Sequence, residues 1–131
     1  MRLLLDTHVA LWAILDDVRL PKKARELIED LGNDVLVSSA SVWEIAIKHA
    51  LARGHAHDMP VSGPAALAYF RSAGYELLAI NADHAAAISA LPPLHTDPFD
   101  RMLVAQARTE PLRLVTHDGR LAQYGAPVML V

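Results

Sequence analysis

The feature that most constrains the fold is a short apolar run near the start of the chain that passes directly into a helical pattern. Residues 3–5 have the length of a buried strand, and residues 9–14 continue with apolar side chains at helical spacing. Asp6 lies where one pattern changes to the other. In open parallel α/β sheets, ligands bind outside the carboxyl ends of the strands. The first residues therefore predict a strand–helix unit with a carboxylate at the functional edge of a sheet.

The rest of the chain alternates in the same way between short apolar runs and amphipathic stretches. We expect helices at residues 7–15, 22–31, 64–73, 83–91 and 98–108, and a strongly apolar helix that ends at residue 52. Further strands are expected at residues 35–37, 75–80, 112–116 and 128–131. Residues 54–63 are the least regular stretch. Strands that alternate with helices predict a single α/β domain over residues 1–131, with a central parallel sheet of about five strands flanked by helices.

Composition excludes several classes of protein. The 131 residues are 53% hydrophobic with a mean hydropathy of +0.22, which excludes low-complexity disorder and favours strands covered on both faces. No cysteine is present, so disulfides, thiolate metal sites and thiol nucleophiles are excluded. The net charge of −3 argues against a nucleic-acid binder that relies on a basic patch. Without a membrane-length apolar run or a signal-peptide pattern, we expect a cytoplasmic protein that does not enter the membrane.

Acidic residues stand at two predicted strand ends, and each has an ordinary structural explanation. Asp6 suits the N-cap of the following helix, although Thr7 can cap in its place and free the carboxylate. Asp118 precedes Gly119, and Asp-Gly is a common pair in turns. Taken separately, neither acid requires a function.

Acids also lie in the first turns of two predicted helices. Glu44 can pair with Lys48 at i, i+4, worth roughly 0.2–0.5 kcal/mol, but its helix is otherwise so apolar that a buried carboxylate there needs a partner or a metal ion. Pro98 fits a first helical position, which makes Asp97 the better N-cap and Asp100 the third helical residue, as in a capping box. Asp100 is therefore the better candidate for a site, with Asp97 as the reserve candidate.

All four junctions belong at one edge of a parallel sheet. They bring together Asp6, Glu44, Asp100 and Asp118. Crowded carboxylates raise one another's pKa unless cations neutralise them. Oxygen ligands without cysteine or a clear histidine cluster suit Mg²⁺ or Mn²⁺ better than Zn²⁺. The sequence therefore predicts a divalent-cation site at this edge.

Histidines and aromatic residues near these acids admit more than one interpretation. Three histidines flank acids and either approach the site or serve in capping and packing: His8, His95 and His117. One further group is interpreted as a polar loop rather than a transition-metal site: His55, His57 and Asp58. Three aromatic residues at apolar helical positions are expected in the core: Trp12, Trp43 and Phe99.

Four segments of the sequence resemble the four motifs of the PIN domain, in order and over nearly the whole chain. They are Leu4-Leu-Asp-Thr-His8, Ser41-Val-Trp-Glu-Ile-Ala-Ile-Lys48, Asp97-Pro-Phe-Asp-Arg-Met-Leu-Val-Ala-Gln-Ala107 and Leu114-Val-Thr-His-Asp118. The resemblance is closest to VapC-type toxin ribonucleases of bacterial toxin–antitoxin pairs. It implies a catalytic, metal-binding acidic quartet: Asp6, Glu44, Asp100 and Asp118. It leaves open whether Asp97 or Asp100 contacts the metal. Residues expected to line or support the site are Thr116, Lys48, Asp97 and Thr7.

The resemblance also implies an activity and its partners. It implies Mg²⁺-dependent hydrolysis of RNA phosphodiester bonds to 5′-phosphate and 3′-hydroxyl ends, with one or two ions held mainly by Asp6 and Asp100 or Asp118. Lys48, Arg53 and Arg101 are candidate cations for positioning the substrate. A cognate antitoxin and a homodimer are implied as well. Two alternatives stay open, a non-catalytic PIN-like interaction module and a metal-dependent nuclease that acts on DNA.

Overall fold

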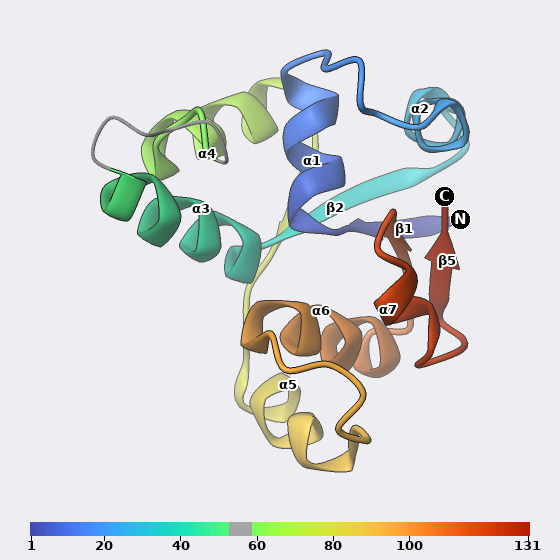
Figure 1. Ribbon diagram of the computed structural model, residues 1–131. Helices are drawn as coiled ribbons and strands as arrows, with labels where there is room; N and C mark the ends of the chain where they lie inside the picture. The colour runs from blue at the N-terminus through green and yellow to red at the C-terminus, as the bar shows by residue number, and fades with distance from the viewer. Residues whose placement is uncertain (53–58) are drawn as a thin grey trace.

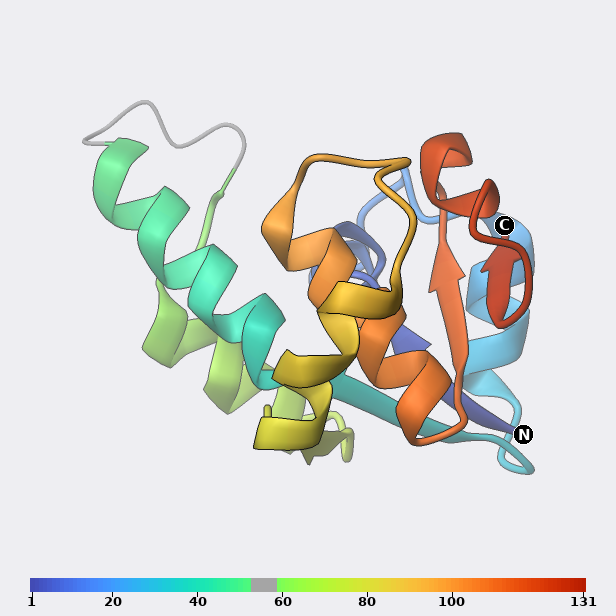
Figure 2. The ribbon, with the colours of Figure 1, turned by 90° about the horizontal axis from the view of Figure 1, so that it is seen from below.

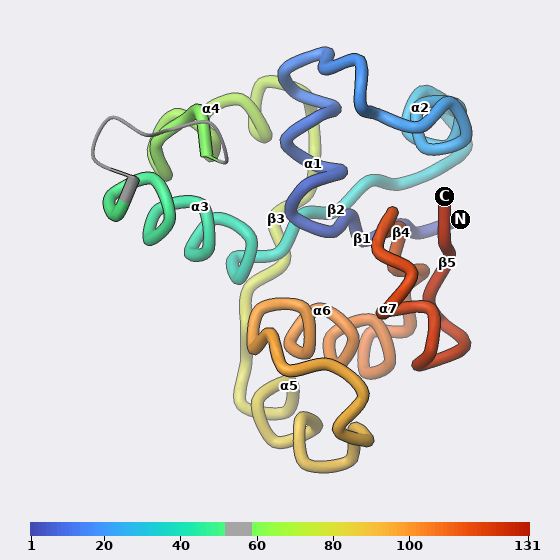
Figure 3. The backbone as a smooth tube through the Cα atoms, in the orientation of Figure 1, coloured from blue at the N-terminus to red at the C-terminus, as the bar shows by residue number. Residues whose placement is uncertain are grey.

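Five parallel strands form one sheet at the centre of the molecule. The computed structural model describes residues 1–52 and 59–131. The strands are β1 (Arg2–Leu5), β2 (Asp34–Ser38), β3 (Glu76–Leu78), β4 (Arg113–Thr116) and β5 (Val128–Leu130). Their order is β3-β2-β1-β4-β5, and every neighbouring pair is parallel (Figure 3). The predicted parallel sheet of five strands is confirmed.

Helices cover both faces of this sheet. On one side lie α1 (Thr7–Ile14) and α2 (Lys22–Glu29), and on the other lie α5 (Ala82–Ala87) and α6 (Pro98–Thr109) (Figure 1). Viewed from below, α5 and α6 lie in front of the sheet (Figure 2). The remaining helices are α3 (Ser39–Ala52), α4 (Gly63–Ser72), the 3₁₀ turn η1 (Ile88–Ala90) and the short α7 (Gly119–Ala122). The structure is thus the predicted α/β domain with helices flanking the sheet.

The strand β1 lies at the centre and alternates its side chains between two cores. Leu3 and Leu5 pack in the core under α1, α2 and α4, whereas Leu4 packs in the core under α6. All three are fully buried. Alternation of side chains along a strand explains why a continuous apolar run is needed when both faces are covered.

We expect Leu4→Ala to lower the free energy of unfolding by about 2–5 kcal/mol, because the surrounding core closes only partly over the cavity. Urea denaturation measures the change. Leu51→Ala is the matched control, since the Leu51 side chain lies on α3 and is 71% exposed. Its effect is expected within about 0.5 kcal/mol. An equal loss of stability in both variants would contradict the placement of β1 in the core.

The structure corrects several predicted boundaries. Helix α2 ends at Glu29, not at residue 31, because Asp30 is extended and its carboxylate accepts the Gly32 N–H at 2.9 Å. Leu31, predicted in the apolar stripe of that helix, is fully exposed. The helix predicted at residues 83–91 is interrupted at Ala87 and continues as η1. The sequence did not predict α7.

None of the three aromatic residues expected in the core is fully buried. Trp43 is 58% exposed, so its placement in the core was wrong. Phe99 and Trp12 are half-buried, and Trp43 packs edge-to-face on Phe99 with ring centroids 5.0 Å apart. Trp43 has apolar neighbours in the sequence, so the pattern predicts burial. Other elements cover only part of the surface of α3, and Trp43 lies on the part that stays exposed.

Helix α4 lies very close to α3. A Cβ atom at Gly63 would lie 2.8 Å from Cβ of Ala46, so only glycine permits this approach. His55, His57, Asp58 and Arg53 lie outside the described residues. Among the helices of the described residues, none combines the length and hydrophobicity that crossing a membrane requires.

Candidate active site

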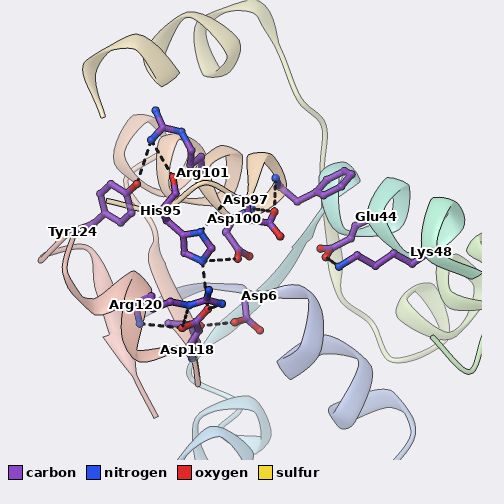
Figure 4. A network of polar contacts seen from close by, with 12 residues as sticks. Asp6, Glu44, Lys48, His95, Asp97, Asp100, Arg101, Asp118, Arg120 and Tyr124 are labelled. Atoms are coloured by element: carbon purple, nitrogen blue, oxygen red, sulfur yellow. Dashed lines mark hydrogen bonds and ion pairs between the residues drawn. The ribbon is translucent and has the colours of Figure 1, made fainter. Parts of the chain in front are cut away.

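The carboxyl ends of β1 and β4 lie side by side. From β1 the chain builds the sheet first toward β2 and β3 and later toward β4 and β5, so the gap between β1 and β4 is the point where the direction of strand addition changes. Asp6 follows β1 and Asp118 lies two residues beyond β4. In open parallel sheets, ligands bind at such a switch point. The N-terminal parts of α3 and α6 face the same edge. Figure 4 shows Asp6, Glu44, Asp97, Asp100 and Asp118 directed toward a common region.

Asp6 is both a helix cap and a member of this group. Its Oδ1 accepts the Val9 N–H at 2.9 Å, and its Oδ2 accepts the hydroxyl of Thr116. The side chain is almost fully buried, and this burial raises the pKa of Asp6 above its usual value. Capping and site geometry are therefore compatible here, because the two carboxylate oxygens have separate partners.

Thr7 does not take over the cap, as the sequence allowed. It is the first residue of α1, and its hydroxyl donates to Oγ of Ser41 at 2.9 Å. The bond joins α1 to α3. Thr116 connects the two strand ends, since it donates to Asp6 and accepts the Asp118 N–H at 3.0 Å. Thr116 thus bonds directly to two of the acids, whereas the Thr7 hydroxyl bonds to a serine.

Glu44 carries the clearest sign of a missing partner. It is 3% exposed, and its Oε2 accepts a hydrogen bond from Nζ of Lys48 at 2.5 Å. Its Oε1 is the only buried side-chain oxygen or nitrogen among residues 1–52 and 59–131 that lacks a hydrogen-bond partner. An unpartnered carboxylate oxygen is costly to bury. The i, i+4 pair predicted for Glu44 exists, but it satisfies only half of the carboxylate.

Lys48 stays charged beside this acid. Partial burial opposes ionisation, but the bond to Glu44 and the negative charges of Glu44, Asp97 and Asp100 raise the pKa of Lys48 above its usual value. Its side chain is partly exposed, so Nζ remains accessible to a ligand at the site.

The pair at the start of α6 divides its roles as the sequence predicts. Oδ1 of Asp97 accepts the N–H groups of Phe99 at 2.8 Å and Asp100 at 3.2 Å, which makes Asp97 the N-cap. The capping box is not closed, because the Asp97 N–H donates to Nδ1 of His95 instead. The Asp100 carboxylate is therefore directed toward the other acids.

Asp100 experiences the crowding most strongly. Burial, followed by the negative charges of Asp97, Asp6, Glu44 and Asp118, raises the pKa of Asp100 to about 7. Near neutral pH the Asp100 carboxyl is therefore protonated in a part of the molecules, unless a cation neutralises the neighbouring acids. The predicted crowding of carboxylates at one edge is present in the structure.

Asp118 differs because it has a cation beside it. Its carboxylate accepts Nε of Arg120 at 3.2 Å and Nη2 at 3.0 Å, and this pairing holds the pKa of Asp118 below its usual value. Its Oδ1 also accepts the Arg120 N–H at 2.9 Å, which caps α7. The sequence analysis missed Arg120, although a basic residue two positions after an aspartate is within reach of that acid.

His95 completes the group. Nε2 of His95 lies 3.3 Å from Oδ2 of Asp100 and 3.5 Å from Oδ2 of Asp118. Its Nδ1 accepts the Asp97 N–H at 3.1 Å, so the proton of the neutral ring is on Nε2, facing the acids. In this tautomer His95 donates to the carboxylates and approaches the site, one of the two roles that the sequence left open for it. The other two histidines contact the ring of Trp12 instead: His8 and His117.

Arg101 does not serve as a cation at this site. Its guanidinium donates to the carbonyls of Pro92 at 3.3 Å and His95 at 3.4 Å, and to the hydroxyl of Tyr124 at 3.4 Å. Figure 4 shows the side chain directed away from the carboxylates. Arg101 instead holds the loop that carries His95.

The residues present fit a divalent cation. His95, Asp100 and Asp118 each offer an atom within 4.8 Å of the others. The unpartnered oxygen of Glu44 and the raised pKa of Asp100 are what a set of ligands shows without its cation. Carboxylate oxygens are ligands that suit Mg²⁺ or Mn²⁺.

Comparison with known proteins agrees with this fold. The model of the PIN domain matches residues 3–127, and the chain therefore belongs to the PIN domain family. Among curated proteins, no match is found.

Solved structures share the fold at low sequence identity. VapBC2 from Rickettsia felis, bound to a DNA fragment from its promoter, is 17% identical with a TM-score of 0.67, covering 100% of this chain and 98% of that one. A toxin–antitoxin complex from Klebsiella pneumoniae is 19% identical with a TM-score of 0.62, covering 96% and 94%. VapC20 from Mycobacterium tuberculosis, a toxin that cleaves the sarcin-ricin loop, is 20% identical with a TM-score of 0.63, covering 94% and 95%.

Proposed function

We propose that this protein is a Mg²⁺-dependent endoribonuclease and the toxin of a toxin–antitoxin pair. The observation that carries the proposal is the buried, unpartnered Oε1 of Glu44 beside three further converging acids in a chain of the PIN family. The similar folds of a toxin–antitoxin complex and of a toxin that cleaves the sarcin-ricin loop support the choice of RNA and of an antitoxin partner. A homodimer and a cytoplasmic location belong to the same proposal.

The acids Asp6, Glu44, Asp100 and Asp118 would hold the cation, with His95 beside them. When bound, Mg²⁺ would supply Lewis-acid stabilisation of the phosphate and a lowered pKa for a coordinated water. The chain prepares the site before substrate arrives. Val9 and Thr116 fix the Asp6 carboxylate, and the Asp97 N–H fixes the ring of His95. Such preorganisation removes the need to reorient these groups during the reaction.

Two cations of the chain would orient an RNA phosphate. Arg120 has a side chain that is 70% exposed and a planar fork suited to phosphate oxygens. Lys48 reaches the same region from α3 (Figure 4). Each is paired with an acid of the proposed site, so neutralisation of that acid by a cation weakens the pairing and favours contact with the substrate.

The first test is cleavage of a panel of structured RNAs with and without Mg²⁺, by the wild type and by Asp6→Asn. Asparagine keeps the N-cap of α1 and removes the charge. We expect the variant to lose cleavage by roughly 10²–10³-fold, the size of the loss of one preorganised electrostatic contact.

Asp34→Asn is the matched control, because Asp34 is exposed at the opposite edge of the sheet, at the start of β2. It should cleave as the wild type does. Equal cleavage by all three proteins would point to a contaminating nuclease and contradict the assignment. Cleavage of DNA in place of RNA would favour the alternative substrate, and no response to Mg²⁺ in cleavage or melting would favour a non-catalytic module.

A further inference from the structure

An apolar cavity of about 320 Å³ lies between α3, η1 and the start of α6. Its walls include the aromatic rings of Trp43 and Phe99 and the apolar side chains of Ile88 and Met102. Two polar side chains, Thr96 and Arg101, also line it. Neither the metal-binding acids nor the packing of the core accounts for it. The cavity has the size of a small-molecule pocket, at the lower end of the usual 300–1,000 Å³ range.

Trp43 is the unusual member of this wall. It is 58% exposed, although a tryptophan contributes more apolar surface than any other side chain. Its edge-to-face packing on Phe99, at 5.0 Å between centroids, holds the ring in place without covering it. A fixed and exposed aromatic ring at a cavity is a stacking surface for a planar group.

The cavity shares two helices with the acidic group. Trp43 directly precedes Glu44 on α3, and Phe99 lies between Asp97 and Asp100 at the start of α6. The N–H of Phe99 donates to the Asp97 carboxylate at 2.8 Å, so the backbone that carries the ring is fixed to the acids. The cavity and the acids are therefore carried by the same parts of α3 and α6.

We propose that the cavity binds a nucleobase next to the scissile phosphate, with the base packed against Trp43 and Phe99. The proposal rests on the proposed ribonuclease function and adds a base-binding subsite to it. Single-stranded RNA is recognised in this way, by stacking of unpaired bases on aromatic side chains and by contacts to their polar edges. The wall also contains two polar side chains, Thr96 and Arg101. The Arg101 guanidinium already donates to backbone carbonyls and to Tyr124, so the aromatic rings carry the proposed contact with the base.

A nucleobase accounts for these observations better than a protein helix does. Exposed apolar residues also recur along α3 at Trp43, Ile47 and Leu51, a spacing typical of a helix-docking face. Ile47 and Leu51 do not line the cavity, whose walls come from α6 and η1 as well as from α3. The aromatic wall and the backbone shared with the acids favour a planar group belonging to the substrate.

The test compares binding of two oligonucleotides without divalent cations. One is a 2′-O-methyl RNA tetranucleotide that resists cleavage, and the other is an abasic tetramer with the same number of phosphates. In Trp12→Phe, Trp43 is the remaining tryptophan of the two in the chain, so its fluorescence reports on the cavity. We expect the tetranucleotide to quench Trp43 and to bind about 5- to 150-fold more tightly than the abasic tetramer.

Trp43→Ala should remove this preference for bases, and Trp43→Phe should keep most of it. Leu51→Ala is the control on the same helix, outside the cavity wall, and should keep it fully. Equal binding of the two oligomers by the wild type, or an unchanged preference in Trp43→Ala, would overturn the base-binding subsite and leave this face to a protein partner. Cleavage with Mg²⁺ is measured separately, so a failed subsite remains distinguishable from a failed nuclease assignment.

Discussion

Asp100→Asn is expected to make the metal-free protein more stable and to abolish cleavage. The wild-type carboxyl is buried among four other acids, which raises its pKa to about 7, so ionising it at pH 8 costs free energy. A neutral amide of the same shape avoids this cost. Each unit of pKa shift corresponds to about 1.4 kcal/mol, and the side chain is partly solvated. We therefore expect a gain on the order of 1–3 kcal/mol.

Urea denaturation at pH 8 in EDTA measures the gain, and RNA cleavage with Mg²⁺ measures the loss, expected to be at least about 10²-fold. Asp83→Asn is the matched control, since Asp83 is an exposed acid in the first turn of α5. It should change neither property. A variant that is destabilised and still active would show that Asp100 is a structural residue, and Asp97 would then become the candidate ligand.

The stability of the metal-free protein is expected to fall as the pH rises from about 4 to about 7, and Mg²⁺ should remove this fall. The unfolded chain releases the Asp100 proton near 3.8, whereas the folded protein holds it to about 7. Between these values the folded state binds more protons, so the free energy of unfolding decreases with rising pH. The raised pKa of Asp6 acts in the same direction.

A bound cation neutralises the acids and favours their ionised forms, so its stabilising effect should grow with pH. Thermal melting with and without Mg²⁺ at pH 5.5 and pH 8 measures the difference. The lowered pKa values of Asp17 and Asp118 contribute below about pH 4, outside this window. Asp100→Asn should flatten the dependence in EDTA. A larger Mg²⁺ effect at pH 5.5 than at pH 8 would contradict the placement of the cation at Asp100.

The convergence of the acids could be predicted from sequence because it depends on local patterns and one topological rule. Asp6, Asp100 and Asp118 each stand at a point where a strand ends or a helix begins, and parallel strands bring such points to one edge. The predicted N-cap roles of Asp6 and Asp97 are correct, whereas the capping box with Asp100 is not closed and Asp118, predicted in a turn, caps α7.

The contacts between distant segments of the chain were harder to predict from the sequence. The sequence left open whether His95 approaches the site, because Arg101, a residue of another element, binds the carbonyl of His95 and so helps to set the path of its loop. The exposure of Trp43 has the same origin. Hydrophobic periodicity indicates which residues favour burial, but it does not show how far the neighbouring helix extends to cover them.

By itself, the sequence determined the alternation of strands and helices, the buried first strand and the expectation of acids at one edge of the sheet. These follow from side-chain periodicity and from the geometry that all parallel strands share. Only the tertiary structure decided that Glu44 retains an unpartnered oxygen, that Arg120 and His95 contact the acids, and that a cavity lies beside them. These features depend on distances between side chains far apart in the chain, which no local pattern encodes.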